Sequence, residues 1–176
     1  MGWTNDVRGI TMDVKCINPF MGAIKNVFKT MLKMDVQFGK PHVKTNEETC
    51  HDVSGIIGLS GDVAGAVIVS FPKLSALKIA GIFAGVTLSD ADEDFADAIG
   101  ELANIIAGNA KKDIEGLKIM ISTPSVVIGP GHHVKSIRDL PKLVIPCSCQ
   151  AGSFVVEVGI KKVNQTNGTL VGAAAE

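Results

Sequence analysis

Two strand–turn–strand patterns constrain the fold of this 176-residue chain more than any other feature. In the first, the apolar segments 53–59 and 64–71 flank a Ser-Gly-Asp turn. In the second, segments 143–149 and 154–161 flank a Gln-Ala-Gly turn. Short apolar segments joined by turns that contain glycine are typical of β-hairpins. Because hairpin strands are antiparallel, the chain is predicted to form a mostly antiparallel sheet.

Helical patterns lie before and between the two hairpins. Residues 18–34 carry apolar side chains at helical spacing, with Asn18 as the predicted N-cap and Pro19 as the first helical residue. Two more helices are predicted at residues 74–83 and 91–114. Hairpins combined with helices in this order indicate an α+β fold, a mostly antiparallel sheet with helices packed on it.

Further strand segments extend the predicted sheet. Residues 35–44 are predicted to form an edge strand, because Pro41 cannot donate a ladder hydrogen bond. Segments 117–122 and 125–128 are also predicted strands. We expect one domain over residues 15–162, since no repeat or long linker divides it. An irregular leader, residues 1–14, and a flexible tail, residues 163–176, are expected to flank this domain.

Charge and hydropathy exclude two classes of partner. The chain has 17 basic and 18 acidic side chains, whereas a nucleic-acid-binding protein normally carries a basic excess. No apolar segment reaches the roughly 20 residues needed to span a bilayer, and the N-terminus lacks the apolar centre of a signal peptide. We therefore expect neither a nucleic-acid nor a membrane partner, and a cytoplasmic location.

A zinc site is one alternative for the polar residues near the C-terminal hairpin. The adjacent pair His132-His133 and the motif Cys147-Ser148-Cys149 could supply ligands. Adjacent histidines point in different directions, however, and structural zinc sites usually separate paired cysteines by two to four residues. The pattern favours a solvated loop and two small residues on one face of a strand. A small-molecule sensor that uses the His132-His133 loop as a lid is a further alternative, but the sequence shows no polar cluster to support it.

The predicted helix 91–114, with Ser89-Asp90 as its expected cap, separates apolar from polar side chains. At 100° per residue one side carries Phe95, Ile99, Leu102 and Ile106, and the opposite side carries Asp97, Glu101, Asn104 and Gly108. Glu101 and Asn104 therefore stand side by side and point away from the core. A glycine inside a helix costs roughly 1 kcal/mol relative to alanine, so Gly108 suggests the close approach of another backbone. Because every amphipathic helix has a polar face, spacing alone does not assign a function.

The segment 97–110 resembles the signature helix of the CheC/CheX/FliY family, phosphatases of the phosphorylated response regulator CheY. The family pattern contains an acidic residue or serine, a glutamate, an asparagine and a later proline. Asp97, Glu101 and Asn104 match it in type and spacing. Neither Pro124 nor Pro130 has the family spacing, and Pro124 is interpreted as the counterpart. With the segment around Asn18-Pro19 and the first hairpin, the resemblance covers about residues 15–162.

The resemblance implies a hydrolase that removes phosphate from an aspartyl phosphate on a CheY-like receiver in chemotaxis signalling. Asn104 would orient the attacking water, and Glu101 would dock to the receiver lysine. Asp97 and Gly108 would belong to the docking surface. No cofactor is expected on this chain, because the receiver supplies Mg²⁺. The alternative is a non-catalytic CheC-like adaptor in flagellar or two-component signalling.

The chain contains one E-x-x-N helix, and this single copy favours the CheX branch of the family. Members of that branch are homodimers with a sheet continued between subunits, so we expect a homodimer. Segments 66–69 and 155–158 are the candidate strands for this pairing.

Overall fold

The computed structural model describes residues 17–45, 48, 50–135 and 140–163. The elements follow in the order α1 (Asn18–Met31), β1 (Gln37–Phe38), β2 (His42–Val43), β3 (Val53–Gly61), β4 (Val63–Phe71), α2 (Lys73–Ala84), α3 (Glu93–Lys112), β5 (Ile119–Ile121), β6 (Ser125–Ile128), β7 (Leu143–Cys149) and β8 (Gly152–Lys162). All strand pairs among the described residues are antiparallel, so the predicted α+β fold is confirmed.

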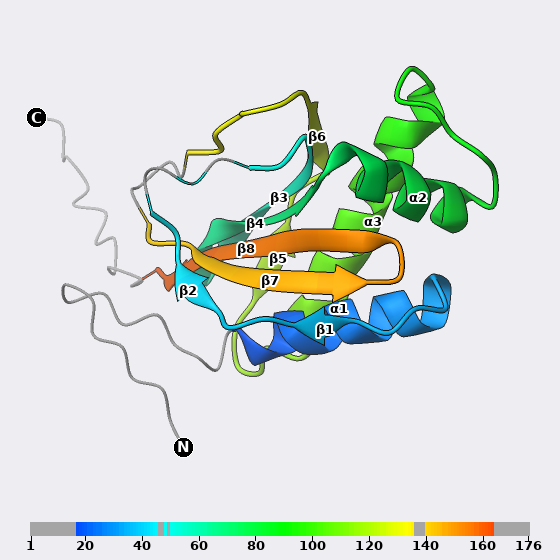
Figure 1. Cartoon of the computed structure of the whole chain (residues 1–176). Helices are drawn as coiled ribbons and strands as arrows, with labels where there is room; N and C mark the ends of the chain where they lie inside the picture. The colour runs from blue at the N-terminus through cyan, green and yellow to red at the C-terminus, as the bar shows by residue number, and fades with distance from the viewer. Residues whose placement is uncertain (1–16, 46–47, 49, 136–139, 164–176) are drawn as a thin grey trace, which may run out of the picture.

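The strands form one sheet of 8, in the order β1-β7-β8-β4-β3-β5, with β2 also paired to β7 and β6 also paired to β3. Both predicted hairpins are present, as β3–β4 and β7–β8. Strand β8 lies between β4 and β7 and joins the two hairpins into a single sheet (Figure 1). The sheet therefore has β5 and β6 along one edge and β1 and β2 along the other.

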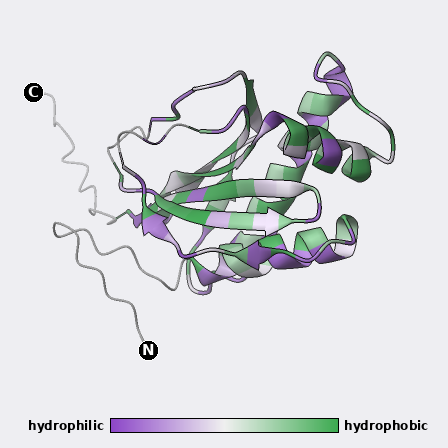
Figure 2. Ribbon diagram, in the orientation of Figure 1, coloured by the Kyte–Doolittle hydropathy of each residue, from purple (hydrophilic) through white to green (hydrophobic). Residues whose placement is uncertain are grey.

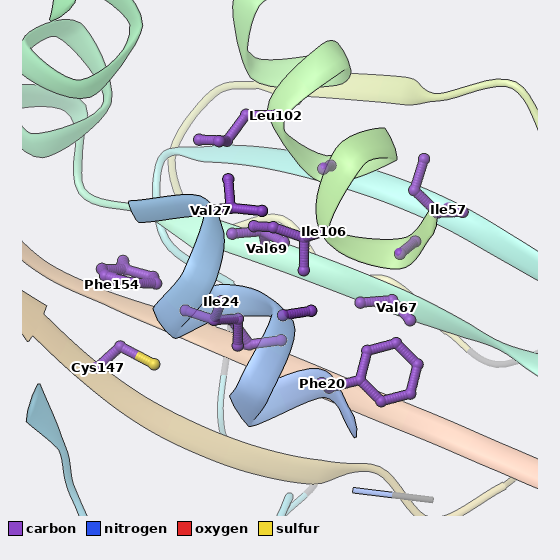
Figure 3. Close-up of a cluster of buried hydrophobic side chains, with 14 of the residues drawn as sticks. Phe20, Ile24, Val27, Ile57, Val67, Val69, Leu102, Ile106, Cys147 and Phe154 are labelled. Carbon is purple, nitrogen blue, oxygen red and sulfur yellow. The ribbon is translucent and has the colours of Figure 1, made fainter. Parts of the chain in front are cut away.

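Helices α1 and α3 cover one face of the sheet and enclose the core with it (Figure 3). The Phe28 ring of α1 stacks on the Phe154 ring of β8 at a centroid distance of 4.8 Å. Alternate strand residues supply the other side of this layer, including Ile57, Val67 and Val69. Helix α2 packs against α3 near the end of β4 (Figure 1). Aliphatic side chains and a few phenylalanines thus build the core.

The hydropathy of the helices follows this layering. Figure 2 shows mostly hydrophobic colour along the central strands and alternating hydrophobic and hydrophilic bands along α1. On α1 the buried positions repeat every three or four residues, as expected for one apolar face against the sheet. The buried residues of α1 are Phe20, Ala23, Ile24, Val27 and Phe28.

The predicted ends of α1 need correction. Ile17 occupies the cap position, and Asn18 with Pro19 lies in the first turn, so Asn18 is not an N-cap. Proline is tolerated there because the first N–H groups of a helix have no intrahelical acceptor. The helix ends at Met31 rather than near residue 34, because Lys33 adopts a φ of 57°.

The predicted cap of α3 is also wrong. The helix begins at Glu93, directly after Asp92, instead of at residue 91. Ser89 does not cap it, since its N–H and O–H both donate to Asp92 Oδ2, at 2.6 and 2.8 Å. Asp90 forms an ion pair with Lys73 of α2. These contacts organise the loop before α3 rather than its first turn.

The predicted edge strand 35–44 is interrupted. It forms the two short strands β1 and β2, both paired with β7 at the sheet edge, with Gly39 and Pro41 between them. The candidate dimer strands 66–69 and 155–158 belong to β4 and β8, which are paired on both sides, so neither is an open edge. The leader 1–14 and nearly all of the tail 163–176 lie outside the described residues.

Candidate functional site

Helix α3 presents the polar face expected from its sequence. Acidic Glu93 and Asp94 lie in its first turn, and Lys111 and Lys112 lie in its last turn. The helix dipole stabilises charges placed in this way. The predicted apolar stripe is confirmed, since its four members are at most 1% exposed: Phe95, Ile99, Leu102 and Ile106. This stripe fixes the rotation of the helix, and the opposite side faces outward.

The four predicted site residues share that outward side. Asp97 and Glu101 are exposed, whereas Asn104 and Gly108 are half-buried. Within the described part of the chain, Asp97, Glu101 and Asn104 make no side-chain hydrogen bond or ion pair. Their polar atoms are thus available to an external partner.

A groove lies along the first half of this face. Its volume is about 470 Å³, and its lining residues are Ala96, Asp97, Gly100, Glu101, Pro124 and Val126. Helix α3 forms one wall and the β6 region forms the other. The proline interpreted as part of the family pattern, Pro124, therefore lies beside Glu101 and Asp97, although more than 20 residues separate them in the sequence.

Two glycines of α3 have different surroundings. A Cβ on Gly100 would lie 3.3 Å from Pro124 Cβ and 3.3 Å from Val126 Cγ2, so this glycine lets the groove walls meet closely. Around Gly108 the nearest heavy atom to such a Cβ is Ile121 Cδ1, at 3.8 Å. No close backbone approach within the described residues explains Gly108.

A buried ionic cluster on the opposite face of the sheet was not predicted from the sequence. Glu157 of β8 is 2% exposed and forms ion pairs with Lys44 and Lys142. Cys50 lies beside this carboxylate, with its Sγ 3.6 Å from Glu157 Oε1. Burial lowers the pKa of the Lys142 ammonium, although Glu157 favours its charged form. The only sequence signal was a single glutamate within an apolar strand.

A series of hydrogen-bonded polar side chains lies on the same face of the sheet, under the loop that contains His132 and His133. His132 Nε2 is 2.8 Å from Ser54 Oγ, which is 2.8 Å from Ser70 Oγ. His132 Nδ1 is 2.7 Å from the Gly129 carbonyl oxygen. Polar groups therefore do lie beneath this loop, and their hydrogen bonds are made within the protein.

The zinc alternative is not supported by the geometry. Cys147 and Cys149 point into the helix-side core, as expected for one strand face, whereas His132 binds Ser54 on the opposite face. Burial raises the pKa of the Cys147 thiol to about 12, which disfavours the thiolate that zinc requires. Across the described part of the chain, no three His, Cys, Asp or Glu side chains are placed to hold a metal ion.

The polar face of α3 can bind and orient but offers no serine, cysteine or histidine nucleophile. A carboxylate such as Glu101 can pair with a cation, and an amide such as Asn104 can accept from water and donate to a second group. The chemistry of the site therefore points to a partner that brings its own reactive group.

No helix among the described residues has the length and apolar character needed to cross a membrane.

Comparison with known proteins places this helix in a family context. Residues 53–148 match the family model described as chemotaxis phosphatase CheX. The CheY-P phosphatase CheX of Thermotoga maritima is 31% identical over 137 residues, which cover 76% of this chain and 88% of the relative.

Solved structures agree with this match. A chemotaxis protein CheX from Desulfovibrio desulfuricans is 32% identical with a TM-score of 0.77, covering 84% of this chain and 99% of that one. A chain in the complex of CheX with CheY, BeF3 and Mg²⁺ from Borrelia burgdorferi is 29% identical with a TM-score of 0.68. That match covers 83% of this chain and 97% of the other.

Proposed function

Because this chain belongs to the CheX family of chemotaxis phosphatases, we propose that it hydrolyses the aspartyl phosphate of a phosphorylated CheY-like receiver. The observation that carries the proposal is the polar face of α3. Asp97, Glu101 and Asn104 lie there, inside the matched segment and without partners among the described residues, and Asp97 and Glu101 line the groove. The relative that is named in complex with CheY supports a receiver as the partner.

The proposed reaction transfers the phosphoryl group from the receiver's aspartate to water. Water attacks phosphorus in line, the bond between phosphorus and the aspartyl oxygen breaks, and inorganic phosphate leaves with a free carboxylate behind it. A loose transition state of this kind requires positioning more than a strong base. This requirement fits a site in which the residue proposed to meet the water is an uncharged amide.

Each site residue has a proposed role. Asn104 accepts a hydrogen bond from the attacking water through its carbonyl and fixes the orientation of that water. Glu101 pairs with a receiver lysine and holds the helix in register. Asp97 and Gly108 belong to the docking surface, where the missing side chain of Gly108 lets the receiver approach. The Mg²⁺ that neutralises phosphoryl charge is proposed to come with the receiver, so this chain needs no cofactor of its own.

Phosphate release from phosphorylated receivers of the same cell tests the proposal. Asn104→Ala should abolish the stimulated release while the protein remains folded, because the side chain is not part of the core. Asn26→Ala, the same change on the exposed side of α1, is the matched control and should behave as wild type. Full activity in Asn104→Ala would rule out the assigned role.

The adaptor alternative is separated by measuring binding and hydrolysis on the same variants. An adaptor would bind a BeF3-loaded receiver without accelerating phosphate release, and Asn104→Ala would change neither. For a phosphatase, Glu101→Ala should weaken binding, and a higher receiver concentration should recover part of the rate.

The proposal also includes a homodimer and a cytoplasmic location. The open edges at β5–β6 and at β1–β2 are the places where a sheet could continue into a second copy. Sedimentation equilibrium would give the mass of the particle and decide between monomer and dimer.

A further inference from the structure

The groove wall opposite α3 is built by an irregularity in the sheet. Strand β3 pairs with β6 up to Ile56 and bonds the β5 segment from Gly58 onward, so Ile57 alone lies opposite two residues, Thr123 and Pro124. One extra residue on one strand of an antiparallel pair is a β-bulge, which redirects side chains and often occurs beside active sites. The bulge directs Pro124 to the groove.

The Ser122 hydroxyl holds this bulge. The Ser122 N–H donates to the Gly58 carbonyl at 2.9 Å, as in a regular ladder. The return bond is different, because the Gly58 N–H donates to Ser122 Oγ, also at 2.9 Å, instead of to a backbone carbonyl. The same hydroxyl donates to the Thr123 carbonyl oxygen at 2.7 Å. The Ser122 side chain thus takes the place of a backbone carbonyl as the acceptor for the Gly58 N–H, and it also bonds to Thr123 in the bulge.

The position of Pro124 depends on these two hydrogen bonds of the Ser122 hydroxyl. Proline has no N–H, so Pro124 cannot donate a ladder hydrogen bond to β3. It instead contacts α3, where a Cβ on Gly100 would meet its ring carbons at 3.3 and 3.4 Å. Without the hydroxyl the Gly58 N–H must find another acceptor, and the bulge loses its fixed shape. The wall beside Glu101 would then shift.

We propose that Ser122 is a positioning residue for receiver dephosphorylation: by holding the bulge, it sets the width of the groove beside Glu101. The inference rests on the proposed function, because the groove matters only if a receiver docks there. Ser122 touches no reacting atom. Its effect passes through Pro124 to the docking surface, and it therefore concerns receiver binding more than the chemical step.

The test compares Ser122→Ala, Ser122→Thr and Thr123→Val in phosphate release from a phosphorylated receiver. Loss of one net hydrogen bond can lower the population of the held bulge by at most roughly three- to tenfold, so KM should rise by up to that factor, with kcat close to wild type. Threonine keeps the hydroxyl and should restore KM. Thr123→Val removes a neighbouring hydroxyl that makes no hydrogen bond within the described residues, so it should leave KM unchanged. Amide hydrogen exchange should accelerate at Gly58 in Ser122→Ala alone.

The outcomes separate this inference from the function on which it rests. If neither the wild type nor Asn104→Ala accelerates phosphate release from the receiver, the proposed function itself is wrong. If the wild type is active and Asn104→Ala is not, a normal KM in Ser122→Ala overturns the positioning role, even with a lower melting temperature. An equal rise in KM for Thr123→Val also overturns it, because any change at this edge would then have the same effect.

Discussion

Gly55 of β3 lies where α3 crosses the sheet, and replacing it with alanine should separate the two elements. An ideal Cβ at this position would lie 2.8 Å from Ala103 Cβ and 3.1 Å from the Ile99 carbonyl oxygen. Carbon atoms in good contact are about 3.5–4.0 Å apart, so the new methyl group overlaps Ala103 by roughly 0.7 Å or more. Both neighbours belong to α3, and one of them is backbone, so the helix must move.

The cost follows from this overlap. Overpacking of a core by one carbon typically destabilises a protein by about 1–3 kcal/mol. For a domain of this size each kcal/mol lowers the melting temperature by about 2–4 °C, so Gly55→Ala should lower it by roughly 2–12 °C. The outward displacement of α3 should also slow receiver dephosphorylation, because misplacement of a site by about 1 Å can cost 100-fold in rate.

Circular dichroism at increasing temperature measures the effect, and two further variants make it specific. Gly22→Ala on α1 is the same chemical change with nothing within 4 Å of the new carbon, so it should raise the melting temperature by relieving a helical glycine. Gly55→Ala combined with Ala103→Gly removes the shortest contact, so the double variant should lose less stability than the two single changes summed. A Gly55→Ala protein as stable as wild type would refute the reasoning.

Three predictions concern other parts of the molecule. Glu157→Gln leaves the half-buried Lys44 and the buried Lys142 ammonium groups without their anion and should cost about 3–5 kcal/mol, seen as a melting temperature lower by roughly 6–20 °C. Lys29→Met, at the exposed pair with Asp35, should change stability by less than about 1 kcal/mol in the same melts, and equal losses at the two sites would contradict the burial argument. Because the folded-state pKa of Cys147 is raised to about 12 from 9.0, the unfolded chain loses this proton first as pH rises, so folding stability should fall between pH 9 and 12. Urea unfolding at several pH values should show a smaller fall for Cys147→Ala, and an identical fall would exclude this thiol as a cause.

Local patterns predicted most of the fold. Both hairpins, the three helices and the buried stripe of α3 were found from alternation, helical spacing and turn residues, because one element's own sequence encodes these features. The ends of the helices were less predictable. Asn18 and Ser89 have the composition of caps, but Pro19 in the first turn and the Ser89–Asp92 hydrogen bonds shift the true boundaries.

Features that depend on strand order could not be derived from local patterns. The segments 66–69 and 155–158 look like any apolar strand, and only the pairing of β8 between β4 and β7 makes them central. The Glu157 cluster joins residues more than 100 positions apart, and the groove wall depends on a one-residue bulge. For the site, the residue types and their shared face followed from the helix, whereas Pro124 was placed by resemblance and its contact with Gly100 is visible only in three dimensions.

The central place of β8 has a consequence for biosynthesis. Every other described strand precedes β8 in the chain, yet β8 supplies the shared partner of β4 and β7. During translation the first hairpin and its helices emerge with the β4 edge unpaired, and β7 emerges with no neighbour on its inner side. Unpaired edges of this kind template association with other chains. The nascent protein therefore cannot complete its sheet until residues 152–162 have left the ribosome, and a product that stops before them is expected to aggregate rather than to persist as a smaller phosphatase.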